Sequence, residues 1–431
     1  MKKEDLKTVV VDQKEEVERI FLEERIIERE FLPSWKRFME SPLIKVITGV
    51  RRAGKSVLSF QLLRDRRYAY INFDDERLAG MTSSDLNMVL QVFYEWLGNF
   101  QFIFLDEVQN IEGWELFVNR IKRQGFHVLV TGSNAKLLSQ EFATHLTGRH
   151  LCIEVFPFSF REFLVFENFK VTEETFYSTR QKSFLIKKLE EYLKIGGFPE
   201  VVKNKENARN YLATLYSTIL ITDVVSRYRI KYIKTLKEIS NYLVSNFANF
   251  ITFNKIKNLF GLRSVHTSKN YVSYLEDAYL FFLLDKFSFK HKEVLASPKK
   301  VYVIDSGIIN TLAFRVSENF GRLIENTVAV ELLRRKSLNP LLEIYYWRDY
   351  SGKEVDFIVK NGLKVKQLIQ VTYASSKDAI ERRELSALLK AGKELICNNL
   401  LVITWDYEDE EIVENRKIVY KPLYKWLLEN A

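Results

Sequence analysis

One eight-residue segment, GVRRAGKS at residues 49–56, restricts the fold of this chain more than any other feature. It reads glycine, four residues, then Gly-Lys-Ser, a pattern whose backbone N–H groups can turn inward around phosphate oxygens. The apolar run LIKVITG precedes it, and SVLSFQLLRD, with apolar residues at helical spacing, follows it. We therefore expect a strand, a phosphate-binding loop and a helix whose positive N-terminal end faces the phosphates.

Each position of this loop has an expected role in holding ATP. Lys55 is expected to reach the β- and γ-phosphates, and the Ser56 hydroxyl is expected to hold Mg²⁺. The other positions expected to contact the nucleotide are Gly49, Val50, Arg51, Arg52, Ala53, Gly54 and Val57. ATP and Mg²⁺ are thus the predicted cofactors.

Residues from about 40 to 160 alternate strand-like and helix-like segments. Four near-continuous apolar runs are expected to be strands: LIKVITG, YAYINFDD, FQFIFLDE and FHVLVTGSN. Helical patterns between them predict an α/β fold with a parallel sheet covered on both faces. Polar residues stand at the carboxyl ends of the four runs, and ligands of such sheets bind at that edge.

The third run ends in two acids with different expected roles. Asp106 can hold the Mg²⁺ shell, and Glu107 can polarise the attacking water as a general base. An alternative for Glu107 is an acid at a helix N-terminus, stabilised by the helix dipole. The loop and the two acids together predict ATP hydrolysis.

Further polar residues have two open interpretations each. Asn134, after the fourth run, could orient water or sense the γ-phosphate, or it could be an ordinary helix cap. Arg149 could supply positive charge to a γ-phosphate, including that of a neighbouring subunit, or it could pair with a surface acid. Asp74, Asp75 and Glu76 are either a solvated turn or part of the site.

Composition limits the class of protein. The N-terminal segment MKKEDLKTVVVDQKEEVERIFLEERIIEREF is too charged for a signal peptide and is expected to form an amphipathic helix. No run of about 18 uncharged apolar residues is present, so no membrane span is expected. Cys152 and Cys397 give neither a disulfide framework nor a zinc-binding spacing. We expect a reduced, cytoplasmic protein.

The net charge of +9 is concentrated in one segment. Residues 226–300 hold 14 lysines and arginines against 5 acidic residues, and the rest of the chain is balanced. A concentrated positive segment favours a polyanion as partner, with a solvated surface as the alternative.

The same segment has the helix order of a winged helix-turn-helix. A helix to about Phe247 precedes a short helix near residues 253–260, a turn at Gly261, a third helix from Ser264 and the aromatic-rich run YLFFLLDKFSFKHK. The third helix of such a fold could enter a DNA major groove. The candidate DNA-contacting residues at its start are His266, Thr267, Ser268, Lys269 and Asn270. Winged helices also contact proteins, so a protein partner is the alternative.

The last part of the chain mixes strands and helices again. KVYVID is expected to be a strand, and ENFGRLIENTVAVELLRRK a helix that bears Glu325 and Glu331. Successive strands follow, with hairpin turns at residues 351–352 and 361–362. Glu354 and Asp356 stand two apart on one strand and should face the same side.

Segments spread over nearly the whole chain carry a resemblance to a known family. These segments are GVRRAGKS, YINFDDERL, FIFLDEVQNIEGWE, VLVTGSNAKLLS, LTGRH, VFPFSFREFL, GGFPEVV, KVYVIDSG and YWRDYSGKEVDFIV. The chain resembles AAA+-type ATPases, common in archaea and found in bacteria, that join an ATPase domain to a winged helix and a C-terminal domain related to restriction endonucleases. The resemblance implies self-association, and it implies ATPase roles for the following residues: Lys55, Ser56, Asp106, Glu107, Asn134 and Arg149.

Pattern and resemblance together predict five parts. They are an N-terminal helix (1–40), a P-loop AAA+-like ATPase core (41–160), a helical subdomain (161–225), a winged helix-turn-helix (226–295) and a restriction-endonuclease-like α/β domain (296–431).

The nuclease-like part departs from an active pattern. Such nucleases need an Asp, then an acid-x-Lys on the next strand, so that two carboxylates bind Mg²⁺ and the lysine steadies the nucleophile. Asp356 matches, but Gln370 and Thr372 stand where the acid and the lysine belong. Glu325 or Glu354 could supply a second carboxylate, and nothing obvious replaces the lysine. We expect a relic with little or no nuclease activity.

The sequence therefore predicts a Mg²⁺-dependent, ATP-hydrolysing, self-associating AAA+-like ATPase that acts on DNA. Two alternatives stay open. One is an ATP-switched signalling or protein-interaction ATPase, and the other is an ATP-gated, metal-dependent nuclease.

Overall fold

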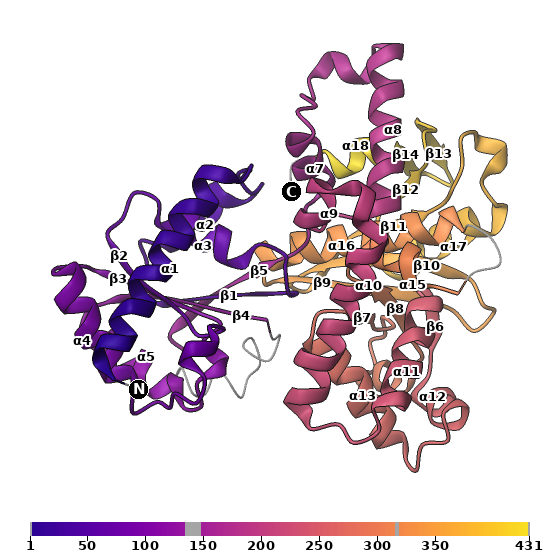
Figure 1. Ribbon diagram of the computed structural model, residues 1–431. Coiled ribbons are helices and arrows are strands. Elements are labelled where there is room, and N and C mark those ends of the chain that lie inside the picture. The colour runs from indigo at the N-terminus through magenta and orange to yellow at the C-terminus, as the bar shows by residue number, and fades with distance from the viewer. Residues whose placement is uncertain (1, 134–147, 315–318, 430–431) are drawn as a thin grey trace. The chain divides into compact units, whose positions relative to one another are not determined.

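The chain folds into two compact units, an N-terminal unit of Met1–Phe156 and a C-terminal unit of Pro157–Ala431 (Figure 1). The computed structural model describes residues 2–133, 148–314 and 319–429. Within these ranges, none of the helices combines the length and the apolar character that a membrane span requires.

A five-stranded parallel sheet forms the centre of the N-terminal unit. Its strand order is β2-β3-β4-β1-β5, and every pairing is parallel. The strands are β1 (Ile44–Gly49), β2 (Tyr68–Asn72), β3 (Phe102–Asp106), β4 (His127–Gly132) and β5 (His150–Val155). The four strands predicted from apolar runs are confirmed. The sequence analysis does not predict β5, because HLCIEV is a half-buried edge strand that mixes polar and apolar residues.

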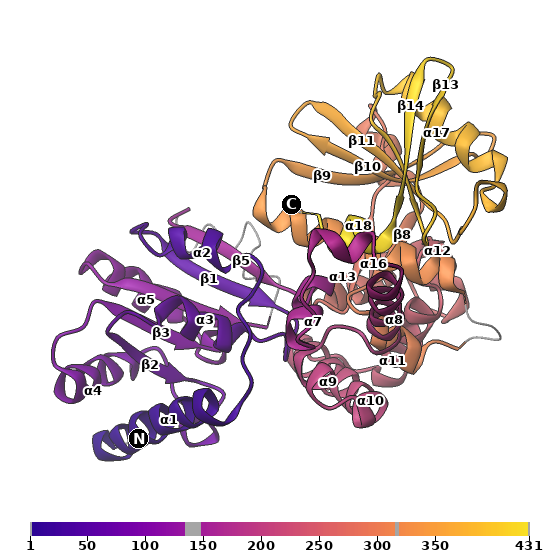
Figure 2. The same ribbon diagram turned by 90° about the horizontal axis from the view of Figure 1, so that it is seen from above.

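Helices cover both faces of this sheet, as predicted (Figures 1 and 2). They are α1 (Lys3–Glu23), α2 (Leu32–Phe38), α3 (Lys55–Leu63), α4 (Leu86–Leu97) and α5 (Trp114–Arg123). Helices α1, α4 and α5 share one core with Ile71 of β2 and Leu105 of β3. Phe60 of α3 instead contacts Tyr70 and Phe104, the alternate residues of the same strands. Alternate strand residues point to opposite faces, so α3 lies on the other face.

The N-terminal helix is shorter than predicted and belongs to this core. It ends at Glu23, and residues 25–29 contain no helix or strand. Its residues Leu6, Val9 and Val10 are buried in the core that α4 and α5 share. Helix α1 is thus a layer of the N-terminal unit.

Two sheets organise the C-terminal unit. One is antiparallel with the order β6-β8-β7, and the other is mixed with the order β13-β14-β12-β11-β10-β9. The strands are β6 (Asn249–Ile251), β7 (Phe281–Leu284), β8 (Lys299–Val303), β9 (Leu342–Arg348), β10 (Glu354–Asn361), β11 (Lys364–Val371), β12 (Leu400–Thr404), β13 (Asp409–Val413) and β14 (Arg416–Pro422). The turns between β9, β10 and β11 fall at the two predicted hairpin positions.

The helices of the C-terminal unit surround these sheets. They are α7 (Phe160–Phe166), α8 (Thr179–Ile195), α9 (Pro199–Lys203), α10 (Ala208–Thr218), a π-helix (Ile219–Ser226), α11 (Ile233–Ser245), α12 (Phe253–Leu259), α13 (Val265–Asp277), α14 (His291–Ala296), α15 (Ser306–Leu312), α16 (Phe320–Leu338), α17 (Arg382–Glu394) and α18 (Leu423–Leu427). The predicted break at GGFPE separates α8 from α9. Helix α17 packs into one core with strands of the mixed sheet.

Strand β8 connects two parts that the sequence separates. The segment KVYVID was expected to open the last part of the chain, beyond the predicted boundary at residue 295. It instead contributes to β8, which pairs with both β6 and β7. A local apolar pattern can predict a strand, but its pairing partners are set by segments distant in sequence.

The contact between α15 and α8 gives a test of this packing. A Cβ atom at Gly307 would lie 2.1 Å from the carbonyl oxygen of Ile195. We expect Gly307→Ala to destabilise the fold by about 1–3 kcal/mol, as overpacking does, because that backbone oxygen cannot rotate away. Urea unfolding followed by circular dichroism measures the loss.

Gly321→Ala is the matched control, since the nearest atom to its added Cβ is 3.7 Å away. It should change stability by no more than about 0.5 kcal/mol. Equal stabilities for the two variants would show that α15 does not pack as described.

Candidate nucleotide-binding site

The loop between β1 and α3 requires glycine at both of its fixed positions. Gly49 has φ 141° and Gly54 has φ 93°, both in a region that favours glycine. A Cβ at Gly49 would also lie 2.0 Å from the carbonyl oxygen of Val155 on β5. Val50 and Ala53 are fully buried and anchor the loop, whereas Arg52 is exposed with φ 67°.

Lys55 extends from the first turn of α3 across the mouth of this loop. Its side chain is 3% exposed, and Nζ donates to the carbonyl oxygens of Gly49 (3.3 Å) and Val50 (3.4 Å). The same Nζ lies 3.7 Å from Oε1 of Glu107. The lysine therefore bridges the loop after β1 and the acid after β3.

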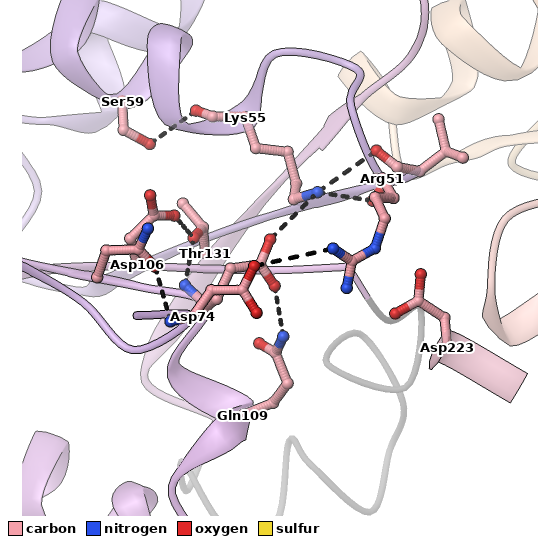
Figure 3. Close-up of polar contacts among 12 residues, drawn as sticks. Arg51, Lys55, Ser59, Asp74, Asp106, Gln109, Thr131 and Asp223 are labelled. Carbon is pink, nitrogen blue, oxygen red and sulfur yellow. Dashed lines mark hydrogen bonds and ion pairs between the residues drawn. The ribbon is translucent and has the colours of Figure 1, made fainter. Parts of the chain in front are cut away.

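Thr131 at the end of β4 holds the two acids in place (Figure 3). Its hydroxyl donates to Oδ1 of Asp106 and accepts a hydrogen bond from the backbone N–H of Glu107 at 3.0 Å. The hydroxyl of Tyr70 lies 3.5 Å from the other oxygen of Asp106. The sequence analysis did not select Thr131, although its place near the carboxyl end of a strand at the ligand-binding edge was a usable signal.

Glu107 stands at the N-terminus of a short helix, as in its alternative interpretation, and its carboxylate also faces Lys55. Glu107 has φ 48°, and its side chain makes no capping hydrogen bond to the short helix that follows. Its carboxylate instead accepts from the Gln109 side chain and faces Lys55. A non-glycine residue in the left-handed region is uncommon and concentrates at functional sites.

Asp106 lies in surroundings that change its acidity. Burial is the main cause that raises the pKa of Asp106 to about 6, and the charge of Glu107 is the second. Hydrogen bonds from Thr131 and Ser56 act in the opposite direction and lower this pKa. Ser56 and Asp106, the two expected Mg²⁺ ligands, therefore lie within hydrogen-bond distance of each other. A buried carboxylate is a natural ligand for such a hard cation.

Some of the remaining predicted residues lie near the phosphate loop, and others lie away from it. Arg51 approaches Asp74 at 3.8 Å (Figure 3), whereas Asp75 pairs with Arg77 and caps a short helix. The backbone of Arg149 bonds Ile44 at the start of β1, so its Cα lies about 20 Å along the strands from the phosphate loop. Arg149 does not join the site of its own chain, and Asn134 lies outside the described residues.

Arg29 is a residue that the sequence analysis missed. It is buried, and its guanidinium donates to the carbonyl oxygens of Ala53 at 2.9 Å and Phe156 at 2.6 Å. One side chain thereby ties the N-terminal segment to the phosphate loop and to the chain after β5. No local pattern reveals it, because both acceptors are backbone atoms far away in sequence.

The five candidate DNA-contacting residues lie at the start of α13, as predicted, but one of them is buried. His266 and Lys269 are exposed, and Thr267 and Asn270 are half-buried. Ser268 is fully buried, and its hydroxyl donates to the carbonyl oxygens of Phe253 and Val265. The hydroxyl of Ser268 therefore supports the helix and cannot reach a nucleic acid.

The candidate nuclease-like residues gather around an unpredicted lysine. Lys300 of β8 lies within hydrogen-bond distance of Glu325, Glu354 and Asp356. Gln370 donates to Asp356 from β11. Glu354 and Asp356 face the same side, as their spacing predicted. A lysine thus stands among these acids after all, supplied by the antiparallel sheet.

Comparisons with known proteins agree with the fold of the N-terminal unit. A family model described as an AAA domain matches residues 41–164. Two models described as domains of unknown function, DUF8612 and DUF4143, match residues 186–319 and 320–424. The solved structure of a Walker-type ATPase of Pyrococcus abyssi is 15% identical with a TM-score of 0.43, over 67% of this chain and 96% of that chain. The family-model match, together with the loop after β1, shows an AAA-type P-loop domain over residues 41–164.

Two relatives match nearly the full chain. An uncharacterized protein of Methanocaldococcus jannaschii is 38% identical over 435 residues, which cover 97% of this chain and 94% of the relative. An uncharacterized protein of Haemophilus influenzae is 29% identical over 424 residues, which cover 94% and 99%. The chain belongs to the family of the Methanocaldococcus jannaschii protein.

Arg29 gives a direct test of how the phosphate loop is held. We expect Arg29→Met to weaken binding of a fluorescent ATP analogue about tenfold, since a hydrogen bond from a charged donor contributes about 1.5 kcal/mol or more. Arg25→Met, at an exposed position of the same segment, is the matched control and should leave the affinity unchanged. Equal affinities for the two variants would remove Arg29 from the site.

Proposed function

We propose that this protein is a Mg²⁺-dependent ATPase that binds DNA and uses ATP hydrolysis to act on it. One observation carries the ATPase part. Lys55 and Glu107, which come from different elements of the sheet edge, lie 3.7 Å apart, with Asp106 fixed beside them by Thr131. This arrangement supports the predicted division of roles among phosphate binding, metal binding and water activation.

The residues present fit both expected cofactors. Backbone N–H groups and Lys55 would hold the phosphates of ATP, and the oxygens of Ser56 and Asp106 suit Mg²⁺, which prefers hard oxygen ligands. When bound, Mg²⁺ would neutralise charge on the phosphates. Glu107 would accept the proton of the attacking water, and Gln109 would hold the Glu107 carboxylate in place.

A charge-neutral substitution tests the role of Glu107. We expect Glu107→Gln to keep ATP affinity within about threefold and to lower the turnover rate at least about a hundredfold, because a positioned general base contributes a factor of this size. Lys55→Ala should instead lose ATP binding. Phosphate release and analogue binding measure the two quantities.

Glu112→Gln is the matched control, since the same change is made at an exposed position in the loop before α5. It should retain the parent rate. A Glu107→Gln variant that hydrolyses ATP at the parent rate would refute the assigned role of the carboxylate.

The element order of residues 233–303 supports the DNA part of the proposal. Helix α11, strand β6, helices α12 and α13, and strands β7 and β8 follow one another as in a winged helix-turn-helix. Exposed basic side chains surround the start of α13, among them Lys255, Arg263 and Lys269. Such a cluster beside a helix that could enter the major groove favours a polyanion.

The connection between β7 and β8 adds a second possible contact surface. It presents Phe289, which is 84% exposed, next to the exposed Lys290 and Lys292. An exposed aromatic ring between lysines suits nucleic acid, because rings stack on bases while ammonium groups meet phosphates. This connection would act as the wing of the proposed module.

A salt titration tests the DNA interface. If Lys269 contacts a phosphate, Lys269→Ala should weaken binding to every duplex sequence alike. It should also lower the slope of log affinity against log salt by about 0.9, the counterion release of one contact. Fluorescence anisotropy between 50 and 300 mM salt, chosen as about the usual range for such slopes, measures both effects.

Lys364→Ala changes an exposed lysine on β11, outside the proposed interface, and should leave the slope unchanged. If the parent protein binds no DNA at low salt, the module contacts protein instead. The ATP-switched signalling alternative then takes precedence.

Self-association through Arg149 of a neighbouring subunit remains part of the proposal, supported by the exposed position of this arginine.

A further inference from the structure

A single buried ammonium group stands at the centre of three carboxylates in the C-terminal unit. The side chain of Lys300 is 3% exposed. Its Nζ lies 2.7 Å from Glu325, 2.6 Å from Glu354 and 2.9 Å from Asp356. A lysine has three N–H donors, and here each donor meets a different carboxylate. Lys300 is therefore saturated.

Two of the carboxylates also accept hydrogen bonds from groups other than Lys300. The hydroxyl of Tyr302 donates to Glu325 at 2.7 Å, and the Gln370 side chain and the backbone N–H of Val371 donate to Asp356 at 2.8 and 2.9 Å. The acids come from α16 and β10, the lysine from β8 and the supporting amide from β11. Carboxylate oxygens from two elements, α16 and β10, thus converge on one point, as ligands do in a cation site.

The charges at this point favour a cation with more than one positive charge. Three carboxylates face one ammonium, and burying charge without compensation is costly. In addition, the buried Oε1 of Gln370 has no hydrogen-bond partner among the described residues, although the other end of this amide bonds Asp356. This unpaired carbonyl oxygen stands on a side chain that bonds Asp356, so it adds a hard acceptor close to the cluster.

The ammonium of Lys300 remains charged in these surroundings. Burial alone would lower the pKa of Lys300, but the charges of Asp356 and Glu325 raise it well above its usual value. The hydrogen-bond distances of 2.6–2.9 Å are longer than the Mg²⁺–oxygen distance of about 2.1 Å, and only the shortest of them reaches the Ca²⁺ range of about 2.3–2.6 Å. The present positions of the oxygens suit an ammonium group, and a metal ion would need them to move inward.

We propose that the ammonium of Lys300 occupies a divalent-cation site as a built-in substitute for the metal, and that removing Lys300 opens this site to Mn²⁺ or Mg²⁺. The native C-terminal unit then binds no divalent cation at this place. This goes beyond the proposed ATPase and does not depend on it, because the site lies wholly within Pro157–Ala431.

Manganese titration without nucleotide tests the substitution directly. The electron paramagnetic resonance signal of free Mn²⁺ falls as the ion binds, so it counts the ions bound per chain. We expect Lys300→Ala to bind one Mn²⁺ more than the parent protein, and Lys300→Ala/Asp356→Asn to lose that ion. Lys299→Ala, which removes the neighbouring lysine paired with Asp285, is the matched control and should behave as the parent does.

Thermal unfolding keeps the test decisive if Lys300→Ala folds poorly. Removing the ammonium leaves three carboxylates without a cation, so this variant should be less stable than the parent in metal-free buffer. Mn²⁺ at a hundred times its dissociation constant should restore about 2.7 kcal/mol, the stabilisation of any ligand that binds only the folded state. The parent and Lys299→Ala should show no such gain.

Two results would overturn the proposal. The first is a parent protein that binds Mn²⁺ and loses it on Asp356→Asn, because the metal and Lys300 would then occupy the cluster together. The second is a Lys300→Ala chain that Mn²⁺ neither binds nor stabilises, whether or not that chain folds without metal.

Discussion

The parallel pairing of β1 with β4, and of β4 with β3, is the constraint on which the candidate ATP site depends. Parallel strands end at the same edge, so the phosphate loop after β1 and the acids after β3 meet although they are far apart in sequence. Thr131 of the strand between them bonds both acids and fixes their distance from Lys55. Glycine at position 49 is part of the same constraint, since β5 approaches it too closely for any side chain. The edge strand that the sequence did not reveal thus explains why the first glycine of the motif is needed.

Two buried lysines, Lys55 and Lys300, show how similar groups can serve opposite purposes. Lys55 is held by long hydrogen bonds to two carbonyl oxygens and lies 3.7 Å from one carboxylate. Its bonds are weak enough for phosphate oxygens to replace them. Lys300 instead places each of its donors on a separate carboxylate at 2.6–2.9 Å. Charge-assisted hydrogen bonds of this length are strong, so Lys300 is a fixed part of the structure. Lys55 is therefore available to a ligand, whereas the ammonium of Lys300 takes the place of a metal ion.

Side-chain contacts, in addition to the chain itself, connect the antiparallel sheet and the mixed sheet of the C-terminal unit. Strand β8 supplies Lys300 to acids of the mixed sheet and its neighbouring helix, and Tyr346 of β9 donates its hydroxyl to the carbonyl oxygen of Pro298 just before β8. Lys299 pairs with Asp285 within the antiparallel sheet. Lys300 is thus neutralised by acids outside residues 226–300, whereas Asp285 is already one of the five acidic residues counted within that segment. The charge available to a polyanion is smaller than the sequence count. The exposed basic side chains lie on α11 and the segment before it, on α12, α13 and the turn between them, and on the connection between β7 and β8.

Sequence alone determined the features that local pattern and motif encode. The strand, loop and helix around Lys55, the four apolar strands with Asp106 at one end, the helices α12 and α13, and the hairpin that puts Glu354 beside Asp356 all follow from spacing over a few residues. Tertiary structure alone decided what depends on distant segments: the support that Arg29 and Thr131 give to the site, the burial of Ser268, the position of Arg149 at the opposite edge from the phosphate loop, and the entry of Lys300 among the acids. The reason is physical. A periodic pattern shows which face of an element is apolar, but a buried charge or hydroxyl finds its partner only when the sheets close around it, and nothing in the local sequence records which partner that is.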